Sequence, residues 1–398
     1  GPLDPVATAR DVVPSRPVGH EREHAPVDAR GGDRPARREL VRRGVPEVGR
    51  DRDLRQRRAL ALLGELQQAS EDVSSLPGKE ESDVAAKNVV RSRVQSLAEV
   101  VSQLLSDDVA EGKLVIWIQR DFDDVPSLHV APLDVSSSLA DTLFEGKPAI
   151  LTSATLTVGG SFHHAASEVG FTFPSQGPWE GIDVGSPFEH GKQGILYVAS
   201  HLPVPGRDGY GEEHLQEIVE LIEASQGGAL CLFTSRRGAE TAAEYARDRL
   251  RTPVLLQGED QLPTLVRDFA DDDATSLFGT LSLWQGVDVP GKTCRLVVID
   301  RIPFPRPNDP LIQARHEAVV ASGGNGFMQV SASHAALLLA QGAGRLLRRS
   351  DDKGVVAVLD PRLRTARYSG FLVASLPPMW PTTDKHVAQA ALTRLAQG

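Results

Sequence analysis

Short apolar stretches rich in β-branched residues alternate with helix-forming stretches through the second half of this 398-residue chain. Strands predicted from this pattern cover residues 149–155, 194–200, 229–235, 253–257, 276–280, 296–301 and 355–360. Between them apolar residues recur every three or four positions, which predicts helices over 212–225, 237–250, 262–270, 310–322 and 332–349. This alternation predicts an α/β fold with a mostly parallel sheet and helices on both faces.

The segment that follows residue 58 has a different pattern. The stretches LALLGELQQASEDVSSL and VAAKNVVRSRVQSLAEVVSQLLSDD place apolar residues at helical spacing, and SLPGKEESD between them is a loop. We therefore expect two helices packed as a hairpin. Further along, KLVIWIQRD and LHVAPLD are predicted strands, and VSSSLADTLFEG is a predicted short helix with a serine N-cap.

Residues 1–58 show neither a helical nor a strand period. They contain 14 Arg, no Lys and 10 Asp plus Glu, a net of 14 − 10 = +4 within a chain of net charge −10. Without Ile, Phe, Tyr or Trp this segment buries too little apolar surface to offset its chain entropy. Three interpretations stay open: a GC-rich gene translated in the wrong frame, plain disorder, and a basic arm for nucleic acid. The chain also begins with Gly, which suggests a fragment.

Composition narrows the class of protein. The chain is 40% hydrophobic and 24% charged, the mixture of an ordinary globular protein. No apolar run approaches the ~18 residues that a membrane helix needs, and the first residues lack the apolar segment of a secretory signal, so we expect a cytoplasmic protein without a membrane. With only Cys231 and Cys294, the chain offers neither a disulfide framework nor a four-cysteine zinc or iron–sulfur site. An acidic chain binds nucleic acid only through a local basic groove.

Small polar residues follow several predicted strands. They are Thr152 to Thr155, Thr234 to Arg237, and Gly279 with Thr280. In parallel sheets the ligand lies outside the carboxyl ends of the strands, where hydroxyls and exposed amides suit phosphate oxygens. Taken singly, each hydroxyl is more often the N-cap of the next helix. Their recurrence on one sheet edge favours a phosphate-binding surface.

Residues 286–293, GVDVPGKT, match the G-x-x-x-x-G-K-[ST] pattern of a phosphate-binding loop. Such a loop follows a strand and opens a helix, whose first amides hold the phosphates. Here Thr293 is followed by CRLVVID, a strand pattern, and too few residues separate it from Asp300 for a helix and a return. We therefore reject the match, and with it a self-contained kinase or GTPase.

Four segments in order, AILTSATL (149–156), LFTSRRGAE (232–240), FGTLSLWQGVDVPG (278–291) and QGAGRLLRRSDDKG (341–354), resemble motifs III to VI of superfamily 2 helicases. The chain is most similar to the DinG/XPD-like group, including bacterial DinG-type forms without an iron–sulfur cluster. The resemblance extends to Ser186-Pro187-Phe188 with Gln193, to residues 302–305 (IPFP), and to Asp360-Pro361-Arg362. Gln285 departs from it, because the family usually has Glu there.

The resemblance implies two RecA-like domains that bind ATP between them and move 5′→3′ on single-stranded DNA. Residues 179–398 would be the second domain, and residues 59–178 a remnant of the first with part of its helical arch. The Walker A loop and the DEAH-type box that binds Mg²⁺ would lie upstream, so ATP and Mg²⁺ are the expected cofactors and the chain alone is expected to be inactive. Single-stranded or forked DNA is the expected partner of a monomer. The alternative is a non-enzymatic nucleic-acid-binding module or an inactive helicase fragment.

The resemblance also implies roles for individual residues. Arg348 would be the arginine finger, Arg345 its partner and Gln341 a phosphate sensor; these are the expected catalytic residues, and no metal ligand is expected in this chain. Expected ATP-binding residues are Gly286, Asp288 and Gly344. Expected DNA-binding residues are Ser153, Thr155, Ser235, Arg236, Thr280, Ser282 and Trp284. From the residues alone, Arg345 and Arg348 also suit a surface cluster that compensates a helix dipole, and Trp284 suits an ordinary core position.

Overall fold

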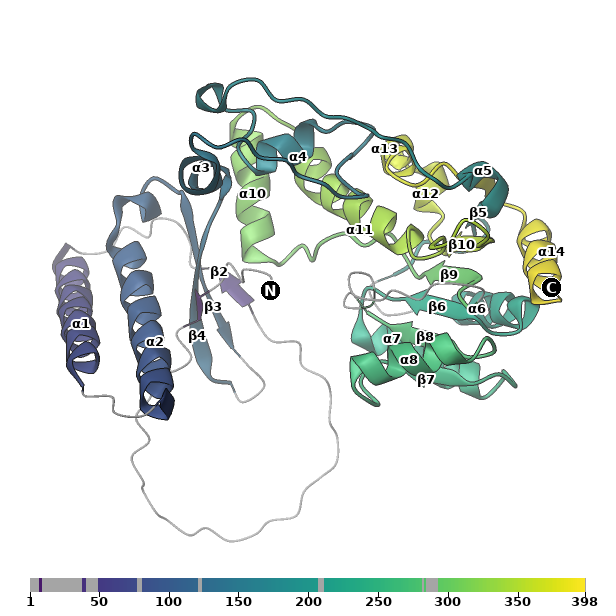
Figure 1. Ribbon diagram of the computed structural model, residues 1–398, viewed down its shortest axis with the longest axis horizontal. Coiled ribbons are helices and arrows are strands. Elements are labelled where there is room, and N and C mark those ends of the chain that lie inside the picture. Colours follow the sequence, from purple (N-terminus) through teal and green to yellow (C-terminus); the bar gives the residue numbers. More distant parts are fainter. Residues whose placement is uncertain are drawn as a thin grey trace, which may run out of the picture. The chain divides into compact units, whose positions relative to one another are not determined.

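The computed structural model of the chain describes residues 7–8, 38–40, 49–76, 81–120, 124–206, 211–280, 283 and 293–397. It forms two compact units (Figure 1). The first consists of Gly1–Val135 and Arg306–Ala321, and the second of Ser136–Pro305 and Ser322–Gly398. This division follows packing alone, and the domain boundary expected after residue 178 stays a prediction.

A helical hairpin and a small antiparallel sheet make up the first unit. Helices α1 (Gly49–Ser75) and α2 (Glu81–Leu105) lie side by side, which confirms the predicted hairpin, although α1 begins earlier than the pattern indicated (Figure 1). A 3-10 turn, η1 (Asp107–Val109), follows α2. The sheet has the order β1 (Ala7–Thr8), β4 (Pro126–Pro132), β3 (Leu114–Arg120), β2 (Arg38–Leu40). Strands β3 and β4 are the two that the sequence predicts.

Only β1, β2 and the start of α1 represent residues 1–58 in the described structure. The remainder of the prediction that this segment is disordered or misframed lies outside the described residues. None of the helices that the structure describes is both long enough and apolar enough to cross a membrane.

Helix α10 (Pro310–Ala321) completes the first unit from a distant part of the sequence. Its Ala314 packs with the buried Val115 and Trp117 of β3. The guanidinium of Arg315 donates a hydrogen bond from Nε to the carbonyl oxygen of Leu133, at 3.0 Å. An apolar contact and a directional one therefore fix this helix against the small sheet.

A seven-stranded parallel sheet forms the centre of the second unit, which confirms the predicted α/β fold. Its order is β11 (Trp380–Thr382), β5 (Gly194–Val198), β10 (Gly354–Val358), β9 (Leu296–Ile299), β6 (Ala229–Leu232), β8 (Ser276–Gly279), β7 (Val254–Leu256). The longer helices are α6 (Glu212–Ser225), α7 (Arg236–Arg247), α8 (Leu262–Asp271), α11 (Ser333–Ala343) and α14 (Lys385–Ala396). Shorter helices are α3 (Ser136–Leu139), α4 (His163–Glu168), α5 (His190–Gln193), α12 (Arg362–Thr365), α13 (Ser369–Ala374), the 3-10 turn η3 (Pro174–Gln176) and the π-helical turns η2 (Ala140–Phe144) and η4 (Phe327–Ala332).

Each face of this sheet is covered by its own set of helices. Along β9, Val297 and Ile299 belong to the core that α8, α11 and α13 complete, whereas Leu296 and Val298 belong to the core under α6, α7 and α14. Successive side chains of a strand point to opposite faces. A strand buried on both faces is therefore apolar throughout, which is why the sequence signal for these strands is a continuous run.

Two elements differ from their predictions. The strand predicted over 149–155 is wrong: these residues are coil, and Ile150 is 90% exposed. No strand among the described residues pairs with this segment, and an apolar run without a partner strand has no ladder to join. The helix predicted over 332–349 ends at Ala343. The edge strand β11 was not predicted, because Trp380 to Thr382 contains a proline and is too short for a period.

Candidate functional site

Buried carboxylates organise the carboxyl edge of the large sheet. Asp300 follows β9 and is 0% exposed. Its two oxygens accept hydrogen bonds from the backbone amide of Thr234 at 3.2 Å and from the Thr234 hydroxyl at 3.1 Å. Arg301 Nε lies 3.3 Å from the same carboxylate. Since Thr234 follows the neighbouring β6, this carboxylate fixes the course of the chain between β6 and α7.

A second buried carboxylate, Asp360, follows β10 and is also 0% exposed. It accepts hydrogen bonds from the backbone amide of Ile302 at 3.0 Å and from Arg362 Nη2 at 2.7 Å. Hydrogen bonding to this carboxylate raises the pKa of Arg362. The expected D-x-R motif is therefore an ion pair on a buried carboxylate, and the hydrogen bond from the Ile302 amide joins this carboxylate to the chain leaving β9.

Three of the expected DNA-binding residues lie at this same edge. Thr280 follows β8, and its amide and hydroxyl reach Oε1 of Gln257 at 2.7 and 3.2 Å. Arg236 begins α7 after β6, and a Cβ on Gly258 would come within 3.3 Å of its Nη2. Gly258 has φ +105°, a conformation that favours glycine. The structure thus brings Arg236, Gln257 and Thr280 together around the end of β8.

The neighbouring Ser235 acts as a helix cap. Its Oγ accepts a hydrogen bond from the amide of Gly238 at 3.1 Å, so it is the N-cap of α7. Arg236 is exposed and pairs with Glu240 at 2.9 Å, one turn along the helix. The structural role foreseen for strand-end hydroxyls therefore applies to Ser235, whereas Arg236 keeps its guanidinium in solvent.

The expected catalytic residues occupy the opposite, amino edge of the sheet. Helix α11 ends at Ala343, so the prediction of a helix over 332–349 that would contain Arg345 and Arg348 is wrong at this end. Gly344 caps the helix, and the chain then turns. The buried carboxylate of Asp352 accepts hydrogen bonds from the amides of Arg348 and Arg349, both at 2.7 Å, which competes with continued helix.

The side chain of Gln193 bonds to the backbone of this turn, which runs over residues 344–353 and is called the arginine-bearing turn below. Its Nε2 donates to the carbonyl oxygens of Ser350 and Asp352 at 2.8 and 3.0 Å, and its Oε1 accepts from the amide of Glu189 at 2.7 Å. The serine of the same motif, Ser186, receives the amide of Phe188 at 3.2 Å. The motif that resembles S-P-F-x-x-x-x-Q therefore helps to fix the backbone of the arginine-bearing turn.

Ser153 and Thr155 do not follow a strand of the sheet. They lie in the exposed coil where a strand was predicted, and the amide of Thr155 donates to Ser153 Oγ at 3.2 Å. Ser282, Trp284, Gly286 and Asp288 lie outside the described residues. Thr293 is described: its hydroxyl bonds Asp273 at 2.9 Å, and the chain then enters β9 with no intervening helix. The rejected phosphate-loop match therefore lacks its helix.

The arginine-bearing turn has a feature that suits a polar ligand. Gln341 Oε1 is buried and accepts no hydrogen bond within the described chain. Buried amide oxygens without a partner are uncommon in native proteins. Gln341, Arg345 and Arg348 together offer an amide and two guanidiniums, a donor set that fits nucleotide phosphates. Among the described residues there is no cluster of three His, Cys, Asp or Glu able to hold a metal ion.

Comparisons with known proteins agree with this architecture. Residues 218–379 match the family model described as Helicase C-terminal domain. Over 287 residues the chain is 60% identical to "ATP-dependent helicase DinG" of Mycobacterium tuberculosis, covering 71% of this chain and 43% of that protein. The C-terminal part of this chain is a DinG/XPD-like helicase domain. The chain spans less than half of this relative's length.

Two further comparisons, one with a relative and one with a solved structure, show what this chain is similar to. It is 37% identical to "ATP-dependent DNA helicase YoaA" of Escherichia coli over 260 residues, covering 65% of this chain and 40% of that protein. The solved structure of Xpd4 from S. tokodaii has a TM-score of 0.52 and 16% identity, covering 88% of this chain and 62% of that one. At this identity the likeness concerns the fold.

Sequence reasoning missed several residues that shape these two edges. Asp300 was considered only as part of the rejected phosphate loop, and Gln193, Gln257 and Asp352 received no role. Their signal is modest but usable: Asp300 and Gln257 directly follow apolar strands, in the position where a buried polar group must find a partner.

Proposed function

We propose that this chain supplies the second RecA-like half of an ATP-dependent DNA helicase, with residues 179–398 as that domain and residues 59–178 as a remnant of the first domain and its helical arch. The observation that supports this most is the 60% identity over 287 residues to a protein named ATP-dependent helicase DinG. ATP and Mg²⁺ are the proposed cofactors, and single-stranded DNA is the proposed partner. The Walker A loop and the Mg²⁺ ligands would belong to another part of a longer protein.

In this proposal the two edges of the sheet have separate tasks. Gln341, Arg345 and Arg348 contact the phosphates of ATP, and Arg348 places positive charge on the γ-phosphate as negative charge develops there. Asp352 and Gln193 keep the backbone of that turn in place. At the carboxyl edge, Arg236 and Thr280 contact the phosphates of the DNA strand, with Ser235 shaping the turn that presents Arg236.

The remaining expected residues keep their proposed roles. Gly344 lets the turn form close to ATP, and Gly286 and Asp288 complete the nucleotide contacts from motif V. Ser282 and Trp284 contact the DNA, with Trp284 stacking on a base. Ser153 and Thr155 couple the nucleotide state to the grip on DNA.

The decisive experiment joins this chain to the upstream half of the Mycobacterium tuberculosis relative and measures ATP turnover with single-stranded DNA. We expect Arg348→Ala to lower kcat by roughly 10³–10⁵-fold, the usual contribution of an arginine finger, with DNA affinity unchanged. Arg349→Ala, a substitution at the exposed neighbour, is the matched control and should keep turnover. Loss of DNA affinity with normal turnover in Arg348→Ala would mean that residues 341–349 contact DNA instead.

A further inference from the structure

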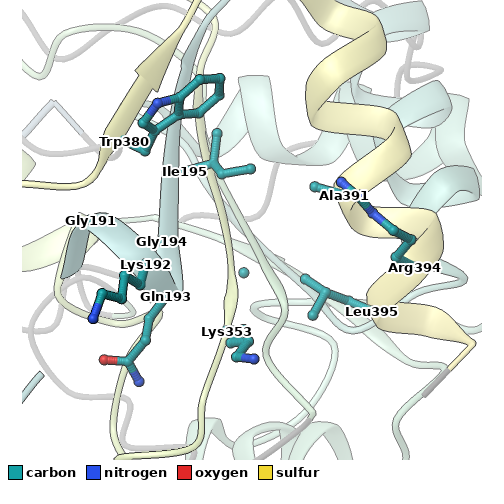
Figure 2. A pocket seen from close by; sticks show the side chains of 11 residues that line it. Gly191, Lys192, Gln193, Gly194, Ile195, Lys353, Trp380, Ala391, Arg394 and Leu395 are labelled. Carbon is teal, nitrogen blue, oxygen red and sulfur yellow. The ribbon is translucent and has the colours of Figure 1, made fainter. Parts of the chain in front are cut away.

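A cavity of about 330 Å³ opens at the amino edge of the large sheet, and of its lining residues only Gln193 has been given a role above. It lies where β5, β10 and β11 begin and where α14 ends (Figure 2). Its volume is within the range of small-ligand sites, roughly 300–1,000 Å³. Among the lining residues only Lys353 and Gly354 fall inside 218–379, the part that matches the helicase family model.

The charged part of the lining is positive. Lys192, Lys353 and Arg394 all line the cavity, and no acidic residue does. Lys192 is paired with Glu189 at 2.7 Å, whereas neither Lys353 nor Arg394 makes an ion pair within the described chain. Two cations beside a cavity without a local counter-charge favour an anionic ligand.

The remaining lining suits a flat, apolar group. Trp380 is 48% exposed although it is paired with Ile195 in the sheet. Ile195, Ala391 and Leu395 supply apolar surface beside it. In Figure 2 the indole lies near Ile195, and Lys192 and Lys353 lie toward the opposite end of the view. Proteins hold single strands with an exposed aromatic ring and cations along one site, with a base stacked on the ring and phosphates on the cations, and this cavity is lined by both kinds of group.

The walls of the cavity are held by bonds that a ligand does not need to make. The amide group of Gln193 is fully used by Glu189, Ser350 and Asp352. Met379 packs closely over Gly194, since a Cβ on this glycine would lie 2.9 Å from Met379 Cγ. The cavity is thus preformed, which reduces the ordering cost of binding.

We propose that this cavity binds one nucleotide of a single nucleic-acid strand, with the base on Trp380 and the phosphate between Lys353 and Arg394. The choice of nucleic acid rests on the proposed function, whereas the need for an anion with a flat apolar part rests on the cavity alone. The site is on the sheet edge opposite Arg236 and Thr280, so it is a second contact and not an extension of the first.

The test uses the 398-residue chain and a fluorescent dT₂₀ oligonucleotide. We expect Trp380→Ala to weaken binding about 5–100-fold, as the loss of one stacked base does, and Trp380→Phe to restore most of it. Lys353→Gln and Arg394→Gln should each lower the slope of log affinity against log salt by about 0.7. Arg267→Gln, which removes an exposed cation on α8, is the control of equal charge and should change neither. Thermal unfolding of each variant separates loss of binding from loss of folding.

Three outcomes would overturn this site. The first is unchanged dT₂₀ binding in all three pocket variants, with weakened binding in Arg236→Ala; the proposed helicase contacts would then stand without the cavity. The second is binding of dTMP as tightly as dT₂₀, which would make it a free-nucleotide site. The third is binding of a Glu-rich peptide at Trp380 without binding of dT₂₀ there, which would make it a peptide site. Weakened binding in the pocket variants but not in Arg236→Ala would support the cavity and reject the carboxyl-edge contact.

Discussion

Arg236 is the residue whose placement most directly suits a DNA phosphate. It is exposed at the start of α7, beside Gly258 and close to the Gln257–Thr280 pair. Removing it should weaken single-stranded DNA binding and reduce the salt slope by about 0.7, one phosphate contact on a single strand. Filter binding over a series of salt concentrations measures this. In a complete helicase, ATP turnover of Arg236→Ala should recover at saturating DNA.

The control for Arg236 is its neighbour. Arg237→Ala removes another exposed cation from the first turn of the same helix. If both substitutions weaken binding equally, the effect is general electrostatics and not a phosphate contact by Arg236.

We expect Asp360 to contribute mainly to the stability of the fold. Its carboxylate is buried, and it holds the Ile302 amide and the Arg362 guanidinium. Removing one partner of a buried pair leaves the other uncompensated, so Asp360→Ala should lower the free energy of unfolding by about 3–5 kcal/mol. Urea denaturation measures the loss. Asp351→Ala, at an exposed aspartate, should be within about 0.5 kcal/mol of the parent.

At the scale of elements, α14 is joined to α6 by charged groups. Lys385 contacts the carboxylate of Glu220 and lies 2.7 Å from the buried Glu217, which also accepts the Tyr197 hydroxyl at 2.6 Å. The hydrogen bond from Lys385 lowers the pKa of Glu220. Burial lowers the pKa of Lys385, but hydrogen bonds to Glu217 and Glu220 outweigh it, so the pKa is raised. At pH values between the pKa of Glu220 and the pKa of Lys385, both side chains are charged.

The sign of the pH dependence follows from the two directions. Because the pKa of Glu220 is lowered, its contribution to stability is fully present above the ordinary value near 4.5. That contribution is lost as the pH falls through the lowered pKa. Because the pKa of Lys385 is raised, its contribution to stability is fully present below the ordinary value of 10.5. That contribution is lost as the pH rises through the raised pKa. Lys385→Gln should therefore cost about 3 kcal/mol near pH 7, because the buried carboxylate of Glu217 loses its ammonium partner, and less in strong acid or base. Lys192→Gln breaks a surface pair instead and should have little effect at any pH.

Elements with strong local periodicity were predictable, and elements that depend on distant partners were not. Helix α6 has the predicted bounds because its apolar face and its ends are both encoded locally. The segment 149–155 has an equally good strand pattern, yet it is coil because no described strand pairs with it. Helix α11 stops early because Asp352, beyond the helix, captures the amides of Arg348 and Arg349.

The candidate site shows the same division. Small polar residues after strands marked the carboxyl edge, since all parallel strands end there. The partner of each one was not visible: Thr280 bonds Gln257 and Thr234 bonds Asp300 through tertiary contacts between separate strands. The separation of the two sets of residues onto opposite edges follows from whether each set precedes or follows a parallel strand, so the predicted strands already indicated it.

At the scale of the whole molecule, the question is which part of the reaction this chain would supply. The chain covers 43% of its DinG relative, and its described residues contain no cluster able to hold a metal ion. Phosphoryl transfer needs a phosphate cradle and a metal on one side and an arginine on the other. By the proposal above, this chain supplies only the second side.

The 398-residue chain alone should therefore show no ATP turnover stimulated by single-stranded DNA, whereas the same chain joined to the upstream half of the relative should turn over. A coupled-enzyme assay with and without dT₂₀ measures both. Turnover by the chain alone in the ordinary enzymatic range, on the order of 1–10³ s⁻¹, would contradict the division of labour. The phosphate-loop pattern at residues 286–293 would then become the candidate site. Lys292→Ala would decide the matter, because a phosphate-binding loop loses activity without its lysine.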